Sequence, residues 1–449
     1  MASTYLTRNI SSSGSSQKGT ISMWVKRSEA PSSGSNAYPR IYQNEYSNSN
    51  FFEVFFRNTG ELQVNNYASD STNLELRTNR KFRDFSAWYH ILISIDTTQS
   101  TSADRCKIYI NGTQETSLAI ATYPSQNTNL LLTNSGYQQH IGYSGYSSEQ
   151  YFGGSMSHYH YCDGYAYSAS DFGSTDATTG EWKGKTSPSV TYGTNGFFIF
   201  KDGNGITDQS GEGNDFTLGG GTLTDLKDNP DNVFATMNPL VYGGTSGQPV
   251  FSNGNTTVSA TGTGGWHPAF GSIGVTSGKW YFETKVIGYN HFVVGIANEA
   301  GTYHTVTSSF PPSQPYSYGI VCYDLGKKET NNSRTTYGAS ANITDGQIIG
   351  TAIDLDNNKL YWSVNGVFKN SGDPTSGSTG TGSAYDLQAG ETYFPMLIGN
   401  VGGGSNPAGG SVNFGNGYFG TTAITTNSGN GYAGAEGSSK FNYTVPTGY

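Results

Sequence analysis

Charged residues are scarce in this chain, since Asp, Glu, Lys and Arg make up 13% of its 449 residues, about half the usual share of roughly 25%. Disordered chains are rich in charge and poor in aromatic rings, whereas aromatic residues reach 14% here. The net charge is −9, and nucleic-acid binding normally needs a basic face. The composition therefore predicts an ordered protein that does not bind nucleic acid.

Cysteine and long apolar runs are scarce too. Cys106, Cys162 and Cys322 cannot form a full disulfide framework, and we expect free thiols in a protein made in the cytoplasm. No run approaches the roughly 18 apolar residues of a membrane-spanning helix. The first ten residues lack the apolar core of a signal peptide. We expect neither membrane insertion nor a secretion signal.

Glycine and tyrosine are abundant, with 61 and 32 residues. Helical periodicity is nearly absent, and short β-branched or aromatic runs predict strands at 19–26, 51–57, 88–96 and 105–110. The pair Asn111-Gly112 supplies the positive φ angles of a tight hairpin turn. We expect this turn to lead into a strand near residues 115–120.

A second set of predicted strands begins after a segment rich in Gly, Asn, Asp and Pro. Regular short strands with turn residues between them favour β-sandwiches over βαβ units. The predicted fold class is all-β, with two antiparallel β-sandwich (jelly-roll) domains in tandem. We expect them at residues 1–218 and 251–449, joined by a linker at 219–250.

Three segments resemble known families. Residues 1–218 resemble a concanavalin-A-like, laminin-G-type domain, through Ile21-Ser-Met-Trp-Val-Lys, Ala87-Trp-Tyr-His-Ile and Lys107-Ile-Tyr-Ile-Asn-Gly. Residues 251–445 resemble an SPRY domain, through Gly278-Lys-Trp-Tyr-Phe-Glu, Ile349-Gly-Thr-Ala-Ile-Asp and Val412-Asn-Phe-Gly. Residues 228–240 resemble a junction in virion structural proteins of marine bacteriophages. These resemblances imply two binding domains carried on a virus particle.

Aromatic residues in Gly- and Ser-rich sequence are the candidate ligand-binding residues. Tyrosine on loops offers rigid, amphipathic contact area, while Ser, Gly and Asn supply adaptable hydrogen bonds. The alternative, that these rings pack under their own loops or at a subunit interface, stays open. The candidates are Tyr143, Tyr146 and Tyr151 in the first half, and Tyr289, His291, Tyr303, His304 and Tyr316 in the second.

One pattern raises the question of a metal. His158, His160 and Cys162 alternate along a predicted strand and would share one side of it. No fourth ligand has support in the sequence, and the alternative places His160 and Cys162 inside the sandwich. We therefore predict no metal and no other cofactor.

Catalysis has little support. Glycoside hydrolases use two carboxylates roughly 5–9.5 Å apart, which on such sandwiches usually occur as Glu-x-Asp-x-x-Glu or Glu-x-Asp-x-Glu. Neither spacing occurs, and the nearest pair, Asp354 and Asp356, is typical of a turn. We predict that the protein is not an enzyme.

These observations favour a non-enzymatic phage protein on the particle surface, either a tail-associated adhesin or fibre or a capsid decoration protein. Its partners would be other virion proteins, further copies of itself, and a host surface glycan or protein. The alternatives are a carbohydrate-active enzyme or secreted lectin, and an intracellular SPRY-type adaptor that binds a peptide.

Overall fold

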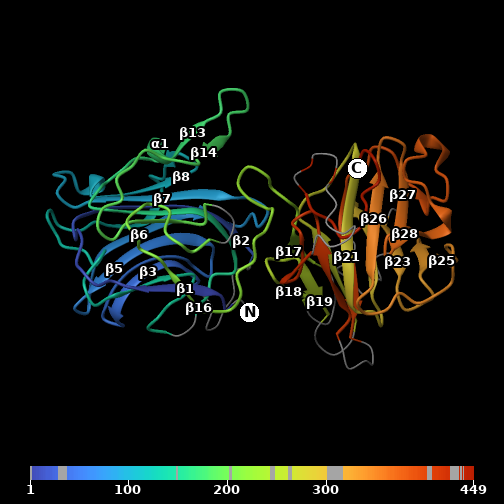
Figure 1. The fold of residues 1–449 in the computed structure, drawn as a ribbon, viewed down its shortest axis with the longest axis horizontal. Helices are drawn as coiled ribbons and strands as arrows, with labels where there is room; N and C mark the ends of the chain where they lie inside the picture. Colours follow the sequence, from blue (N-terminus) through green and yellow to red (C-terminus); the bar gives the residue numbers. More distant parts are fainter. Residues whose placement is uncertain are drawn as a thin grey trace. The chain divides into compact units, whose positions relative to one another are not determined.

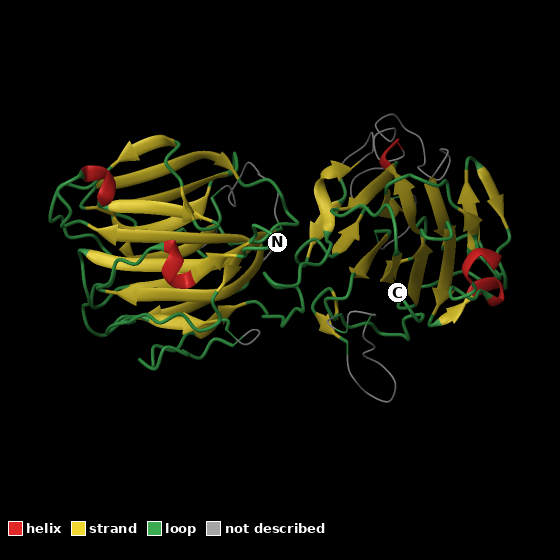
Figure 2. Ribbon diagram, turned by 90° about the horizontal axis from the view of Figure 1, so that it is seen from above, coloured by secondary structure: helices red, strands yellow, loops and turns green. Residues whose placement is uncertain are grey.

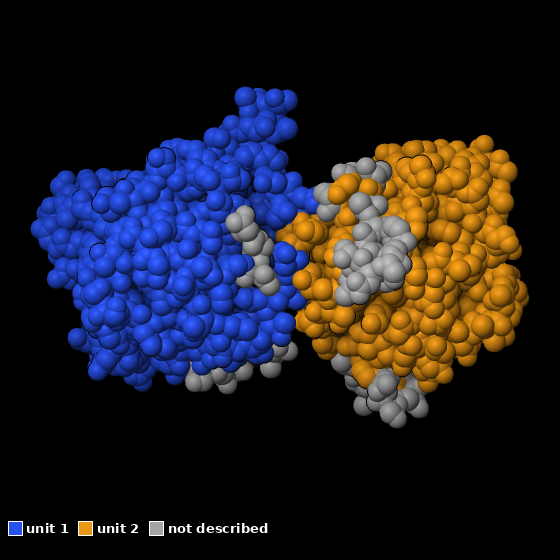
Figure 3. Space-filling model, in the orientation of Figure 1, with its two compact units in different colours: residues 1–225, 229–233 blue, residues 226–228, 234–449 orange. Residues whose placement is uncertain are grey.

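The chain forms two compact units in a computed structural model (Figure 1, Figure 3). Unit 1 comprises residues 1–225 and 229–233, and unit 2 comprises residues 226–228 and 234–449. The regular secondary structure of both is almost entirely strand (Figure 2), so the predicted fold class of two antiparallel β-sandwiches in tandem is confirmed. The structure describes residues 3–28, 38–147, 150–201, 205–242, 248–260, 265–300, 317–401, 407–424, 434, 437 and 439–449.

Unit 1 is a sandwich of two antiparallel sheets. Its eight-stranded sheet has the order β10 (Leu118–Thr122), β6 (Ser71–Lys81), β5 (Glu61–Ala68), β4 (Asn50–Phe56), β3 (Arg40–Ser47), β11 (Gln138–Ile141), β1 (Tyr5–Asn9) and β16 (Thr217–Gly220). Its six-stranded sheet has the order β15 (Phe197–Ile199), β12 (Gly154–Asp163), β2 (Lys18–Arg27), β7 (Tyr89–Asp96), β8 (Cys106–Ile110) and β9 (Thr113–Gln114). A 3-10 turn (Ser102–Asp104), helix α1 (Ala169–Phe172) and the projecting hairpin of β13 (Gly173–Thr175) and β14 (Trp182–Gly184) complete the unit (Figure 1).

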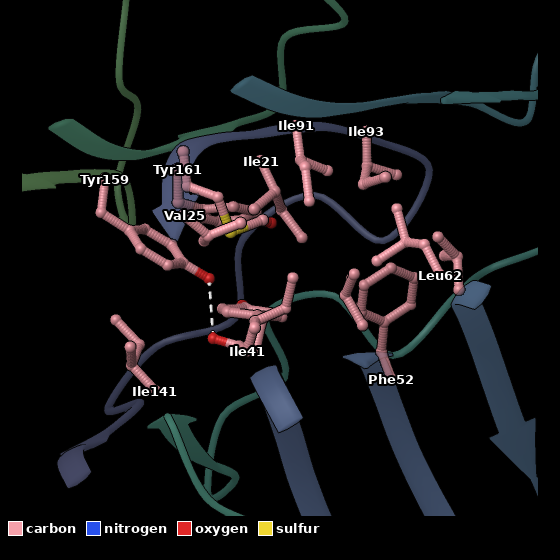
Figure 4. Packing of buried hydrophobic residues seen from close by; sticks show 14 of the residues in the cluster. Ile21, Val25, Ile41, Phe52, Leu62, Ile91, Ile93, Ile141, Tyr159 and Tyr161 are labelled. Carbon is pink, nitrogen blue, oxygen red and sulfur yellow. Dashed lines mark hydrogen bonds between the residues drawn. The ribbon is translucent and has the colours of Figure 1, made fainter. Parts of the chain in front are cut away.

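The core of unit 1 lies between its two sheets. Ile21 and Ile91 of the six-stranded sheet point toward Ile41 and Phe52 of the eight-stranded sheet (Figure 4). The Tyr159 hydroxyl donates a hydrogen bond to the Ile41 carbonyl oxygen at 3.1 Å, which satisfies this phenol inside an apolar core. Alternation along the strands therefore leaves every second side chain on the outer face of each sheet.

The predicted Asn-Gly hairpin is present, but its second strand is shorter than expected. Asn111 and Gly112 have φ angles of 48° and 81°, as a tight two-residue turn requires. The prediction of a second hairpin strand near residues 115–120 is wrong, because only Thr113–Gln114 pairs with β8. The chain then crosses to the other sheet, where β10 pairs with β6 as the edge strand and Leu118 packs against the core.

Unit 2 is a second sandwich of two antiparallel sheets. The seven-stranded sheet has the order β17 (Met237–Tyr242), β20 (Trp266–Gly271), β30 (Tyr393–Asn400), β22 (Val293–Asn298), β23 (Ser317–Val321), β24 (Lys327–Thr330) and β25 (Ser333–Thr335). The eight-stranded sheet has the order β18 (Val250–Ser252), β19 (Thr257–Ser259), β31 (Gly409–Asn413), β21 (Lys279–Gly288), β26 (Ile348–Asp354), β27 (Lys359–Val364) and β28 (Val367–Phe368), and β29 (Tyr385–Asp386) also pairs with β27. The 3-10 turns Lys369–Ser371 and Gly377–Thr379 and the hairpin of β32 (Tyr418–Phe419) and β33 (Thr422–Ala423) lie in loops.

Strand β17 lies within residues 219–250, the segment predicted to be a linker, and pairs with β20.

The three cysteines are buried free thiols, as predicted. No helix among the described residues is long and apolar enough to cross a membrane.

Within unit 2, a buried carboxyl group on β21 binds the C-terminal segment, residues 439–449. Glu283 of β21 has no exposed surface and accepts hydrogen bonds from the backbone N–H groups of Asn442 and Tyr443, each at 2.8 Å. Burial raises the pKa of Glu283 from 4.5 to about 7, although these hydrogen bonds oppose the shift. Tyr449, at the end of the segment, packs against Ala352 and Tyr361.

We predict that unit 2 loses stability as the pH rises from about 4.5 to about 7. In this window folded Glu283 retains a proton that the unfolded chain has lost, so the free energy of unfolding falls with pH and then levels off. Calorimetry of Glu283→Gln should show this slope reduced, because burial also raises the pKa of Glu329 in unit 2, whereas the exposed Glu212→Gln in unit 1 should retain the full slope. An unchanged slope in Glu283→Gln would show that another group is responsible.

Candidate functional site

Three of the predicted ligand-binding tyrosines gather on the outer face of the eight-stranded sheet of unit 1. Tyr143, Tyr146 and Tyr151 follow β11 and lie half-buried against rings from neighbouring strands. The register places Phe51 of β4 directly opposite Tyr67 of β5. We call this surface the aromatic face, and its members are Tyr5, Phe51, Tyr67, Tyr143, Tyr146 and Tyr151.

The Tyr143 platform consists of Tyr5, Tyr143 and Tyr151. The rings of Tyr5 and Tyr143 are stacked with centroids 4.2 Å apart, and Tyr151 lies 5.0 Å from Tyr143. Each such pair contributes about 0.5–1.5 kcal/mol beyond the area that it buries. All three rings are half-buried, so the platform is held in place yet keeps exposed ring surface.

The Tyr146 platform consists of Phe51, Tyr67 and Tyr146. Phe51 stacks on Tyr67 at 5.3 Å and on Tyr146 at 5.0 Å. Phe51 itself is buried, while Tyr67 and Tyr146 are half-buried on either side of it. The platform therefore presents two tyrosines that are supported by a phenylalanine between them.

The segment that connects the two platforms lies directly on the sheet. The Gly145 N–H donates to Gln43 Oε1 at 2.8 Å, and the Tyr146 N–H donates to Glu45 Oε2 at 2.9 Å. A Cβ atom at Gly145 would lie 1.9 Å from Glu45 Oε1 and 2.5 Å from His140 Nε2. A side chain at this position would therefore displace Glu45 and His140 from the places that they take beneath the segment.

A buried ion pair lies beneath the Tyr146 platform. Arg40 Nε and Glu53 Oε2 are 2.9 Å apart, and their side chains are 5% and 3% exposed. Arg40 also donates to the Tyr146 hydroxyl at 2.8 Å, and its guanidinium lies 4.3 Å from the Phe55 ring centroid. Burial raises the pKa of the Tyr146 phenol. The pair thus orients a neutral phenol on the surface.

The carboxylates of this face already have structural partners. Glu53 is paired with Arg40 and accepts a hydrogen bond from Gln43 Nε2 at 3.3 Å, while Glu45 accepts the hydrogen bond of the Tyr146 N–H.

In unit 2, buried Asp354 pairs with Lys279 at 3.3 Å and accepts a hydrogen bond from the Asn357 backbone N–H at 3.0 Å. This Asp354 arrangement is a turn held by an ion pair, which agrees with the interpretation of the sequence.

The three weak candidates for metal ligation do not share a geometry suited to a metal. His158 has a φ of 45° and lies at a register shift in β12, which breaks the alternation on which the pattern depended. Tyr159 and Tyr161 fill the core, so His160 and Cys162 lie on the outer side of the strand. Their predicted alternative position, inside the sandwich, is therefore wrong.

His160 and Cys162 belong to a buried cluster. The His160 ring stacks on Phe198 at 3.9 Å, and its Nδ1 lies 3.0 Å from the Tyr192 hydroxyl. Burial lowers the pKa of His160 and raises the pKa of Cys162. Within the described part of the chain, no group of three His, Cys, Asp or Glu residues is arranged to hold a metal ion.

The candidates in unit 2 are only partly placed. His291 has a φ of 60° and stacks on Tyr323 at 4.9 Å, with Trp266 at 6.1 Å. Tyr289 packs against the core of unit 2. The remaining candidates, Tyr303, His304 and Tyr316, lie outside the described residues.

Sequence reasoning missed the strand residues Tyr5, Phe51 and Tyr67. The run 51–56 carries aromatic residues on both faces of β4, so alternation alone does not show which rings are on the outside. Only the register with β3 and β5 assigns them.

One family model matches part of unit 1. Residues 2–171 match the model described as the concanavalin A-like lectin/glucanases superfamily. They are similar to concanavalin A-like proteins. This match supports the resemblance seen in the sequence and agrees with the sandwich of unit 1. No curated protein matches the chain.

Several solved structures are similar to parts of the chain. The SPRY domain of human HERC1 has 17% identity and a TM-score of 0.29, and covers 39% of this chain and 96% of its own. A human SPRY domain has 16% identity and a TM-score of 0.27, and covers 38% and 96%. A heptameric SAP-like pentraxin of Limulus polyphemus has 14% identity and a TM-score of 0.26, and covers 35% and 69%.

We predict that Arg40→Met destabilises unit 1 by about 3–5 kcal/mol, because it leaves the Glu53 carboxylate buried without its cation. Adding Glu53→Gln should recover part of this loss. Breaking the more exposed Lys81–Glu61 pair with Lys81→Met should change stability by less than about 1 kcal/mol. Urea unfolding measures all three, and equal losses in Arg40→Met and Lys81→Met would contradict the account.

Proposed function

We propose that this chain is a non-catalytic glycan-binding protein whose ligand lies on the aromatic face of unit 1. The observation that carries the proposal is the pair of half-buried tyrosine platforms held on one sheet face. Protein sites for small ligands combine apolar and aromatic walls with a few placed polar groups. A sugar ring needs this combination, because it has apolar C–H faces and a polar rim of hydroxyl groups.

The polar groups next to the platforms suit such a rim. Gln138 and Asn9 lie in the row that runs across the sheet from Phe51 through Glu45. They are joined by a hydrogen bond of 2.9 Å and lie in an exposed setting. Amide oxygens accept hydrogen bonds from hydroxyl groups, and amide N–H groups donate to them.

Binding without hydrolysis is favoured by the state of the two carboxylates described above. A retaining or inverting glycosidase needs one carboxyl group that gives a proton and another that acts as base or nucleophile. Glu53 is enclosed in its ion pair and Glu45 holds the backbone of the connecting segment. Both carboxylates therefore support the platforms, and neither is free to act on a substrate. The absence of released reducing sugar after long incubation with polysaccharides would agree with this.

We predict that Tyr143→Ala and Tyr146→Ala each weaken glycan binding at least about tenfold, because each removes a half-buried ring from one platform. A glycan array identifies the ligand, and isothermal titration calorimetry then measures its dissociation constant. Tyr165→Ala is the matched control, since Tyr165 is 42% exposed and stacks on Tyr167 away from the aromatic face. Full binding by Tyr143→Ala and Tyr146→Ala would refute the proposal.

We further propose that the protein is displayed on a phage particle, where it contacts other virion proteins and further copies of itself and binds the host surface. The support is the phage-type junction at 228–240 and the low charge of the chain. Multiple copies on one particle would strengthen weak single-site binding.

Mass spectrometry of purified particles should then detect the protein, and antibodies against it should label the particle surface and reduce adsorption to host cells. Particles that lack the protein would contradict the virion assignment, while the glycan-binding proposal would be tested separately by the titrations above.

A further inference from the structure

We propose that the aromatic face binds one extended, uncharged oligosaccharide that contacts the Tyr143 platform and the Tyr146 platform at the same time. This inference rests on the proposed function, and it adds the length and the charge of the ligand. Its basis is the spacing of the platforms, the bare glycine between them and the pairing of the charges beneath them.

The spacing follows from the strands beneath the platforms. Phe51 lies on β4 and Tyr5 on β1, and these strands are three positions apart in the sheet, which at about 4.8 Å per position separates them by roughly 14 Å. One sugar ring is similar in width to one aromatic ring and so covers one platform only. A linear chain of several sugar units is required to reach both.

The two residues between Tyr143 and Tyr146 place no long side chain between the platforms. Gly145 lies in the middle and has no side chain, and it is drawn onto the sheet by its hydrogen bond to Gln43. Ser144 beside it is buried and lies within reach of Gln43. No side chain of these two residues therefore rises between Tyr143 and Tyr146, and a chain that lies on both platforms passes over backbone.

The charges favour an uncharged ligand. Among the described residues that build the platforms or hold the connecting segment, the one arginine, Arg40, is paired with Glu53. Glu45 lies beneath Gly145, with His140 Nε2 3.5 Å from its Oε1. Recognition of a carboxylate or sulfate on a sugar needs a cation that is available to it. The aromatic face offers Arg40 only in its ion pair, next to a carboxylate.

Two platforms joined by one ligand act as linked subsites. Once one end of the oligosaccharide is bound, the other end is presented to the second platform at high effective concentration. Affinity should therefore rise steeply when the chain becomes long enough to reach both platforms and then level off. Removal of either platform should abolish this gain and leave the weaker binding of a single platform.

The experiment uses the full chain and neutral, unbranched gluco-, manno- and xylo-oligosaccharides, each from the monosaccharide to the hexasaccharide. For the series that binds, we expect a gain of about 100-fold from the monosaccharide to the bridging length. In Tyr143→Ala and in Tyr146→Ala the hexasaccharide should bind about as weakly as the monosaccharide. Tyr143→Phe keeps the ring and should retain most of the gain, and an unchanged melting temperature excludes loss of folding.

The outcomes separate the two proposals. Equal affinities for the monosaccharide and the hexasaccharide would overturn the bridging of two platforms and leave glycan binding intact. Tighter binding of uronic-acid or sulfated oligosaccharides of equal length would overturn the uncharged ligand. Binding of no oligosaccharide at all would overturn the proposed function itself. A double-mutant cycle with strong coupling for the hexasaccharide and none for the monosaccharide would support the bridged arrangement.

Discussion

The site in unit 1 depends on hydrogen bonds between side chains of a sheet and the backbone that lies on it. Gln43 and Glu45 accept the N–H groups of Gly145 and Tyr146, and the absence of a side chain at Gly145 allows the approach. Because the backbone donors are satisfied by the sheet, the segment lies flat and needs no secondary structure of its own. Each platform then forms where a tyrosine of this segment meets a ring from a strand.

This arrangement also explains why a buried ion pair is retained on an outer sheet face. Replacement of such a pair by apolar residues is often neutral for stability. The role of this pair is therefore to position the groups that Arg40 contacts. Its guanidinium bonds Glu53 on one side and the Tyr146 phenol on the other. In unit 2, Glu283 performs a comparable task, since one buried carboxylate receives two backbone N–H groups and fixes a segment without regular structure.

Much of the fold could be predicted from the sequence, because strand alternation and the Asn-Gly turns depend on local physical chemistry. The tyrosines of the Tyr143–Tyr146 segment were found because Gly and Ser surround them. Phe51 and Tyr67 were not found. Strand β4 carries aromatic residues on both faces, and only its register with the neighbouring strand shows which of them lie on the outer face. The position of His158 relative to His160 and Cys162 could not be predicted for a related reason, since a register shift in β12 is not visible in the sequence.

Hydrogen–deuterium exchange of the full chain, with and without a saturating neutral oligosaccharide, tests the central claim most directly. Exchange reports local protection of the backbone. The account predicts slower exchange at residues 142–147 and in β4 and β5, with no change at residues 164–192 or in unit 2. Protection confined to residues 164–192 or to unit 2 would place the ligand elsewhere and contradict the assignment of the aromatic face.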